Sequence, residues 1–245
     1  MNLHGWRITV LVTSLIVIVL TLYFTLMGWN GIAIKHAIDA TGRSSLILFA
    51  IAFTASSLES LWASSITRWS LKNRRWIGLS FAASHFIHLG LIISVSLLFP
   101  DPFLAEQSLG QWLFGGLAYM FVLLMALTST NQAQHWMGMK NWKRLHYVGS
   151  HWIWTVFLFT YLKHVKEGPF WFYLPFLVFT LLMIPIRFAK HRPLRATISS
   201  SWSRAKLIWV SRVISLGKGN CLKHSPLHWK TPLVAGLLNI QSGDW

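Results

Sequence analysis

The stretch Arg74–Phe99, RRWIGLSFAASHFIHLGLIISVSLLF, decides the fold class of this chain. Two arginines are followed by an apolar run that contains no Asp, Glu, Lys or Arg. Such a run is long enough to cross about 30 Å of hydrocarbon as a helix. It also contains His85 and His88, and ionisable side chains inside a membrane span are costly and tend to mark function. The stretch therefore predicts a membrane-spanning helix that carries functional residues.

The apolar pattern recurs along the chain. Hydrophobic residues make up 54% of the sequence and charged residues 11%, whereas a soluble domain has about 25% charged residues. Tryptophans cluster at the ends of the apolar segments, as interfacial anchors do. We therefore predict an all-α membrane protein, a six-transmembrane-helix bundle. The expected spans are Trp6–Trp29, Ser44–Trp62, Trp76–Phe99, Leu109–Thr130, Leu145–Leu162 and Phe170–Phe188.

Charge in the loops predicts the orientation. The net charge is +16, from 22 Lys+Arg against 6 Asp+Glu. In so apolar a chain we attribute this charge to topology and to anionic lipid, not to nucleic acid. With six spans, the basic loops and the basic tail fall on one side, so both termini are expected to be cytoplasmic. The basic residues of the two inner loops are Arg68, Lys72, Arg74, Arg75, Lys140, Lys143 and Arg144.

Three regions are expected. Residues 1–39 form a first transmembrane helix and an outer loop, residues 40–188 the membrane core, and residues 189–245 a basic cytoplasmic tail. In the tail, Ala196–Leu216 places apolar residues at helical spacing, which is typical of a partly amphipathic segment lying on an anionic leaflet. A poorly ordered basic tail is the alternative. The single cysteine, Cys221, excludes an internal disulfide and a Cys-ligated cluster.

Histidines of the third and fifth spans are expected at matched depth. His85 and His88 lie 10 and 13 residues after Arg75, and His151 lies 9 residues after Trp142. At a rise of 1.5 Å per residue, the first two are about 15–20 Å into the membrane and His151 about 14 Å. Both spans start on the cytoplasmic side. We therefore expect His85 or His88 to face His151 across a gap.

Such a gap suits haem, which is a planar ligand that two imidazoles can hold axially. Bis-histidine ligation gives a low-spin iron suited to electron transfer. Zinc would need a further carboxylate or thiolate, and only Glu59 is a candidate. A proton relay normally uses more buried acids than this chain has. Hydrogen bonding between helices is the structural alternative for each histidine.

Further residues are candidates for the same cofactor, haem b, in one or two copies. His146 lies nearer the surface, and His164 follows it by 18 residues, which is five helical turns or about 27 Å on one face. His146 and His164 would each either ligate a second haem or make a contact that supports a haem ligand. Cationic side chains suit carboxylates. The candidates for pairing with haem propionates, or for setting topology alone, are Arg74, Arg75, Lys143 and Arg144.

Four short stretches carry a family resemblance. They are Ala40-Thr41-Gly42, Arg74–Leu79 followed by His88-Leu89, Ala126–Thr130, and Trp142–His146. Their order and spacing over residues 40–188 resemble the ferric-reductase-like transmembrane domain family. Within that family, the chain is most similar to the haem-binding membrane subunits of bacterial periplasmic methionine sulfoxide reductase systems.

The resemblance implies a six-helix bundle in a bacterial inner membrane, with b-type haem between the third and fifth spans. By motif, His88 and His146 match the family's ligand positions. Thr160 stands where the family has a second histidine in the fifth span, and a threonine cannot ligate iron. Either His151 or His164 takes over that role, or a single haem remains.

No nucleotide-binding module accompanies these spans. The sequence has no G-x-G-x-x-G pattern, and the tail is too short for a flavin or nicotinamide domain. We therefore expect the electron-transfer subunit of an oxidoreductase system, taking single electrons from a quinol or a separate flavoprotein to an external acceptor. Expected partners are membrane lipid, haem, and a redox protein or quinone. The alternative is a haem-free transporter, metal-binding or structural subunit.

Overall fold

The described polypeptide is entirely helical. The computed structural model describes residues 4–100 and 109–189, which belong to one compact unit, and these ranges contain no strand. The expected tail helix Ala196–Leu216 and Cys221 lie outside the described residues. The described helices are α1 (Trp6–Met27), α2 (Gly31–Leu61), α3 (Ser65–Lys72), α4 (Arg74–Leu98), α6 (Leu109–Leu127), α7 (Asn131–Met137), α8 (Met139–Glu167) and α9 (Phe170–Phe188).

Each of the six expected spans coincides with a long helix. Five of these helices, namely α1, α2, α4, α6 and α9, are long and apolar enough to cross a membrane, as expected of a multi-pass membrane protein. The remaining long helix, α8, falls outside this set. Its residues 145–162 carry no Asp, Glu, Lys or Arg, but they include two histidines and several other polar residues. A sixth span therefore stays a prediction.

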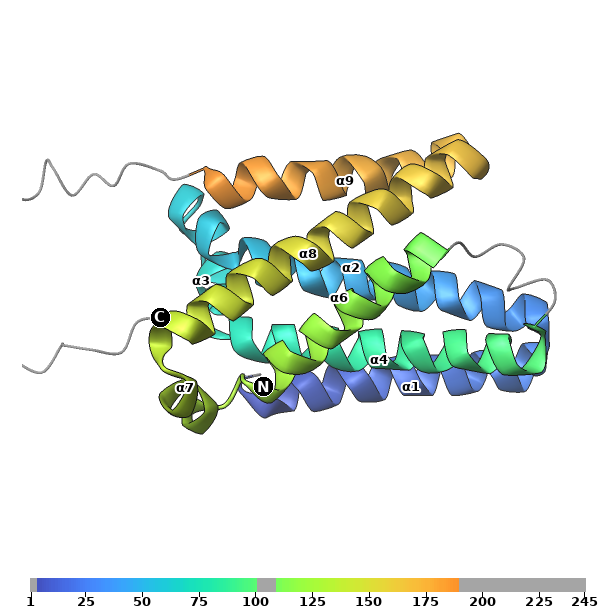
Figure 1. The fold of residues 1–245 in the computed structure, drawn as a ribbon, viewed down its shortest axis with the longest axis horizontal. Helices are drawn as coiled ribbons and strands as arrows, with labels where there is room; N and C mark the ends of the chain where they lie inside the picture. The colour runs from blue at the N-terminus through green and yellow to red at the C-terminus, as the bar shows by residue number, and fades with distance from the viewer. Residues whose placement is uncertain (1–3, 101–108, 190–245) are drawn as a thin grey trace, which may run out of the picture. The chain divides into compact units, whose positions relative to one another are not determined.

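Successive long helices alternate in direction, so that α4 and α8 run the same way while α2, α6 and α9 run the opposite way (Figure 1). The starts of α1 and α4 and the end of α9 consequently lie at one end of the bundle. The hydrogen bond from Arg75 Nη1 to Asn131 Oδ1, 2.8 Å long, places the start of α7 there too. We call this the basic end, because Arg74, Arg75 and Arg187 gather there.

Three local features differ from the expectation. Helix α2 begins at Gly31, where the Asn30 side chain accepts a hydrogen bond from the backbone N–H of Ala33. It runs without a break past residues 39 and 40, where we placed a region boundary. Two short helices, α3 and α7, occupy segments expected to be loops. Ser64 and Thr67 form a capping box at the start of α3, which satisfies backbone donors that otherwise lack partners.

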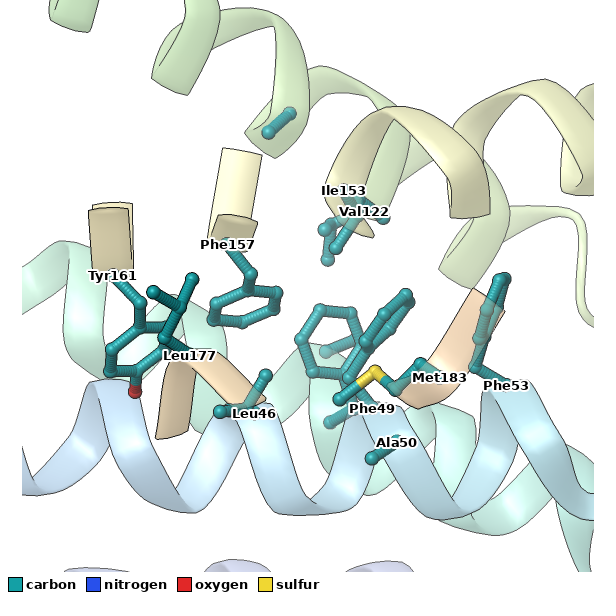
Figure 2. Packing of buried hydrophobic residues seen from close by; sticks show 13 residues of the cluster. Leu46, Phe49, Ala50, Phe53, Val122, Ile153, Phe157, Tyr161, Leu177 and Met183 are labelled. Carbon is teal, nitrogen blue, oxygen red and sulfur yellow. The ribbon is translucent and has the colours of Figure 1, made fainter. Parts of the chain in front are cut away.

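The core lies where α2, α4, α6, α8 and α9 converge. It is filled largely by aromatic rings, and Figure 2 shows Phe49, Phe53, Phe157 and Tyr161 among the aliphatic residues around them. Helix α1 packs against α4 and contributes little to this core, with only Ile8 buried among its residues. The histidines of α4 and α8 border this aromatic core.

Helices α2 and α4 form the most extensive pairing. Small hydroxyl side chains line the contact. Ser84 is fully buried and lies 2.9 Å from Ser45 Oγ and 3.3 Å from Ser44 Oγ. Small residues let helix backbones approach closely, and hydroxyl groups bond between helices in an apolar setting.

Helix α8 makes its most extensive contacts with α9 and α6. A Cβ at Gly149 would lie 2.7 Å from Met125 Sδ and 3.2 Å from Phe121 Cδ1, so the absence of a side chain permits the crossing of α8 and α6. Elsewhere tryptophan indoles connect α8 to its neighbours. Trp152 donates to Phe114 O at 3.3 Å, and Trp154 donates to Thr180 O at 2.8 Å.

Candidate functional site: the histidines of α4 and α8

His85 lies in the interior on α4 and is 9% exposed. Its ring stacks on Tyr119 of α6 with centroids 4.7 Å apart and on Phe81 with centroids 5.3 Å apart. The Nδ1 atom is buried and has no hydrogen-bond partner among the described residues. A buried polar atom without a partner costs free energy, so it is a place where a ligand or water would be stabilised.

His88 lies one turn further along α4, and its ring stacks on that of His85 with centroids 5.5 Å apart. Its Nδ1 atom is 3.0 Å from Ile38 O and 3.0 Å from Thr41 Oγ1, both on α2. Because a carbonyl oxygen only accepts, we assign the proton to Nδ1 and a free lone pair to Nε2. Gly42 leaves room for the ring, since a Cβ there would lie 3.4 Å from Cε1.

For His151 on α8 we also assign the proton to Nδ1, but its acceptor belongs to the same helix. Its Nδ1 lies 2.7 Å from Tyr147 O, one turn earlier in the same helix. Its Nε2 atom is buried and has no hydrogen-bond partner among the described residues. The ring lies edge-on to Phe53 of α2, with centroids 5.4 Å apart. An acceptor nitrogen therefore faces the bundle interior without a donor.

The structure brings His85 opposite a different residue of α8 than expected. His85 contacts the ring of Phe157 with centroids 5.8 Å apart, and Phe157 lies about 9 Å beyond His151 along a helix that rises 1.5 Å per residue. No contact joins His85 or His88 to His151 within residues 4–100 and 109–189.

Aromatic rings connect the two groups of histidines instead. From His151 the contacts run to Phe53, then to Phe49 with centroids 5.2 Å apart, and then to Phe157 with centroids 5.7 Å apart. Figure 2 shows these three phenylalanine rings together in the core. Phe157 in turn contacts His85. The space between the histidines of α4 and α8 is therefore occupied by protein side chains.

His146 and His164 lie toward opposite ends of α8. The Nε2 atom of His146 is 3.4 Å from Thr128 Oγ1, and its ring lies against Trp142 with centroids 4.2 Å apart. His164 Nδ1 is 2.7 Å from Thr160 O, which repeats the own-helix contact of His151. The backbone carbonyl of Thr160 thus accepts a hydrogen bond from the imidazole of His164.

The cationic candidates separate into different environments. Arg74 donates from Nε to Ala52 O at 2.8 Å and is half-buried. Arg75 extends toward α7 and lies over the ring of Trp76, 5.0 Å from its centroid. Arg144 is exposed, as is Lys143, and lines a surface hollow of about 290 Å³. Arg74 is thus bonded directly to the backbone of α2.

Sequence reasoning missed Arg187, in the last turn of α9. Its Nη1 donates to Phe53 O at 3.1 Å and to Ser56 Oγ at 3.0 Å, while its guanidinium lies 5.2 Å from the centroid of the Phe53 ring. In the sequence it resembles any topology-setting charge at the end of an apolar segment. No periodicity or motif distinguishes it.

A search for metal-binding groups and comparisons with known proteins complete the description of the site. In the part of the chain that the structure describes, no group of three His, Cys, Asp or Glu side chains is arranged to hold a metal ion. Comparison of the whole chain with protein-family models, with curated proteins and with solved structures found no match.

Proposed function

We propose that this chain is a b-type cytochrome membrane subunit that carries single electrons across the membrane. The donor is a quinol or a separate flavoprotein, and the acceptor lies outside. The supporting observation is the Nε2 atom of His151, which is buried and has no hydrogen-bond partner in residues 4–100 and 109–189, while Nδ1 is bonded to Tyr147 O. Histidines that ligate metals typically have their other ring nitrogen anchored in this way.

For the second ligand we propose His88. Its Nδ1 is anchored to the carbonyl of Ile38, so its Nε2 is the basic nitrogen, as in His151. His85 is the next choice, since its buried Nδ1 has no partner among the described residues. His146 and His164 are candidates for a second haem, as the family resemblance suggests for His146.

The donor chemistry of these residues fits a haem held by two imidazoles. A bis-imidazole haem supplies a one-electron couple with no open coordination position. The protein's own residues orient the imidazoles through backbone carbonyls and surround them with aromatic rings. Because Phe49 and Phe157 fill the space between α4 and α8, binding requires these side chains to change rotamer. Their apolar surfaces would then exclude water from the cofactor.

The proposal includes six spans, with α8 as the fifth, in a bacterial inner membrane with both termini cytoplasmic. The start of α1 and the end of α9 lie at the same end of the bundle (Figure 1), which supports an even number of crossings. The basic end also agrees with the excess of Lys and Arg in cytoplasmic loops. Cysteine substitution in α7 and in the turn between α8 and α9 tests this topology, because membrane-impermeant thiol reagents label only the external side.

A structural subunit without cofactor is the second candidate. The bond of His88 to the backbone of α2 favours it, because an imidazole that connects two helices already stabilises the bundle. In that case the alanine variants lower stability and change no redox property.

The deciding experiment is a reduced-minus-oxidised optical spectrum of the purified, haem-replete chain, with pyridine haemochrome quantitation. We expect a sharp α band of b-type haem at one or two haems per chain. His88→Ala and His151→Ala should each lose at least one haem's absorbance. His36→Ala is the matched control, since His36 is an exposed histidine of α2, and it should retain the full spectrum.

Two outcomes would contradict the proposal. A flat spectrum from folded protein grown with haem precursor rejects the cytochrome assignment. Full absorbance in both alanine variants would keep the assignment of haem as the cofactor but reject His88 and His151 as its ligands. The same measurement on His85→Ala and His146→Ala would then identify the ligands.

A further inference from the structure

Two arginines from different helices bind consecutive carbonyl groups of α2 at the basic end. Arg74, at the start of α4, donates to Ala52 O at 2.8 Å, and Arg187, at the end of α9, donates to Phe53 O at 3.1 Å. Ser57 Oγ completes the arrangement by donating to Arg187 O at 2.9 Å. These bonds hold the two guanidinium groups against one turn of a single helix.

The two positive charges lack a fixed counter-charge. They repel each other, and neither forms an ion pair with a carboxylate in residues 4–100 or 109–189. Glu59, the acidic residue of α2 that is nearest in sequence to Arg74, forms no ion pair with either arginine. Helix carbonyls offset only part of the cost of two half-buried cations, because each carries a partial charge. An anion at this position would stabilise the pair.

The unused donors define what kind of anion fits. A guanidinium has five N–H donors in a planar fork that matches phosphate and carboxylate oxygens. The bonds to described residues use the Nε of Arg74 and the Nη1 of Arg187. The first turn of α4 adds the positive end of a helix dipole. Phe188, beside Arg187, is an exposed apolar side chain, so the site borders the lipid-facing surface.

We propose that Arg74 and Arg187 together bind the phosphate of an anionic phospholipid at the basic end. The phosphodiester shares its single negative charge between the two guanidinium groups, and the acyl chains of the lipid lie against the apolar surface of α9. This site fixes the start of α4 and the end of α9 to α2. It also sets the local charge near His151, because the ring of Phe53 contacts both His151 and Arg187. The proposal depends on the chain lying in a membrane, and it does not depend on haem.

The test uses the full-length chain purified without haem in neutral detergent. Mixed micelles containing phosphatidylglycerol or phosphatidylcholine are titrated, and thermal unfolding is followed. A ligand that binds only the folded chain raises its midpoint. We expect phosphatidylglycerol to stabilise the natural chain more than phosphatidylcholine, and each of Arg74→Gln and Arg187→Gln to weaken the apparent affinity by about tenfold.

Arg68→Gln is the matched control, because Arg68 is an exposed arginine of α3 and its loss removes the same charge. It should leave the phosphatidylglycerol effect unchanged. Arg74→Lys and Arg187→Lys keep the charge, so they remain informative if the glutamine variants fail to fold, and they should show intermediate affinity. Equal stabilisation of natural chain and glutamine variants by phosphatidylglycerol overturns the proposal.

A carboxylate of the cofactor is the other source of the same chemistry, and a second titration separates it. Haem and haem dimethyl ester differ only in the charge of the propionates. If phosphatidylglycerol has no effect and the natural chain binds haem more tightly than the ester in a manner that needs Arg74 and Arg187, the lipid assignment is rejected in favour of the propionates. Absence of haem binding leaves the lipid result intact and rejects only the cytochrome assignment.

Discussion

The two helices that carry the interior histidines are held in the bundle by different chemistry. On α4, Ser84 bonds with small hydroxyl side chains of α2 and His88 bonds with its backbone. On α8, large indole rings reach outward, and among the residues that the structure describes His151 bonds only with its own helix. The orientation of one imidazole thus depends on tertiary packing, whereas that of the other is local to its helix.

This difference indicates which contacts between helices can rearrange. Close backbone packing through small residues resists any separation of α2 and α4. Side chains rather than backbone contacts fill the space between α4 and α8, and side-chain rotamers change more easily than helix positions. A flat ligand is therefore more easily accommodated on the α8 side of α4 than on its α2 side. Four substitutions test this contrast.

Ser84→Leu should have the largest effect, because it adds a bulky side chain to a fully buried position and removes the contact with Ser45. We expect the free energy of unfolding to fall by about 2–3 kcal/mol, measured by unfolding in mixed detergent micelles. Ser94→Leu is the control on the same helix, because Ser94 is half-buried and its side chain bonds to Gly90 O within α4. Equal effects of the two changes would refute close packing of α2 and α4.

Thr41→Val comes next, and it tests the dependence of His88 on α2. The substitution keeps the side-chain shape but removes the hydroxyl that lies 3.0 Å from Nδ1. We expect a loss of about 1 kcal/mol in stability and, if the proposed function holds, about tenfold weaker haem retention. Haem transfer to apomyoglobin measures the retention. Thr155→Val on α8 removes a hydroxyl that bonds to His151 O within the same helix, and it should leave haem retention unchanged.

Trp154→Phe tests the indole contacts of α8. The change removes the N–H that donates to Thr180 O at 2.8 Å, and interhelical hydrogen bonds in membranes average about 0.6 kcal/mol. We expect a loss of that size in unfolding free energy. Trp171→Phe removes an indole that is 81% exposed and should change the unfolding free energy by less. A loss of several kcal/mol at Trp154 would mean that α8 is fixed as firmly as α4.

Gly42→Ala should have the smallest effect. The added methyl group would lie 3.4 Å from His88 Cε1, an ordinary van der Waals contact, and alanine favours the helix by up to about 1 kcal/mol. We expect the unfolding midpoint to stay level or to rise slightly. A clear fall would show that the ring of His88 has less room than the structure gives it.

Hydropathy predicted the long helices well because each expected apolar run has at least 18 residues, about the length that crosses a membrane as a helix. It missed the start of α2, since Lys35, His36 and Asp39 interrupt the apolar pattern while the helix continues through them. It also missed α3 and α7, which are short helices that depend on side-chain caps at Ser64 and Thr130. Caps of this kind are local hydrogen bonds and leave little trace in hydropathy.

The site was harder to predict. The sequence placed His85, His88 and His151 inside helices of the same direction, which agrees with the structure. Depth counted from flanking residues led us to expect His85 or His88 opposite His151. Helix α8 is inclined to α4 (Figure 1), so residues at equal distances from the two helix starts do not lie side by side. The bond of His88 to Ile38 O depends on the packing of two helices and has no signature in either one.

The length of α2 has a mechanical consequence. At 31 residues it measures about 46 Å, some 15 Å more than the hydrocarbon layer it would cross. Because α2 is one continuous rod, we expect a thicker or thinner bilayer to change its tilt instead of being absorbed by a loop before Ser44. The serine contacts transmit that tilt to α4, and the imidazole of His88 moves with both helices. Lipid chain length is thus coupled to the geometry of the histidine site.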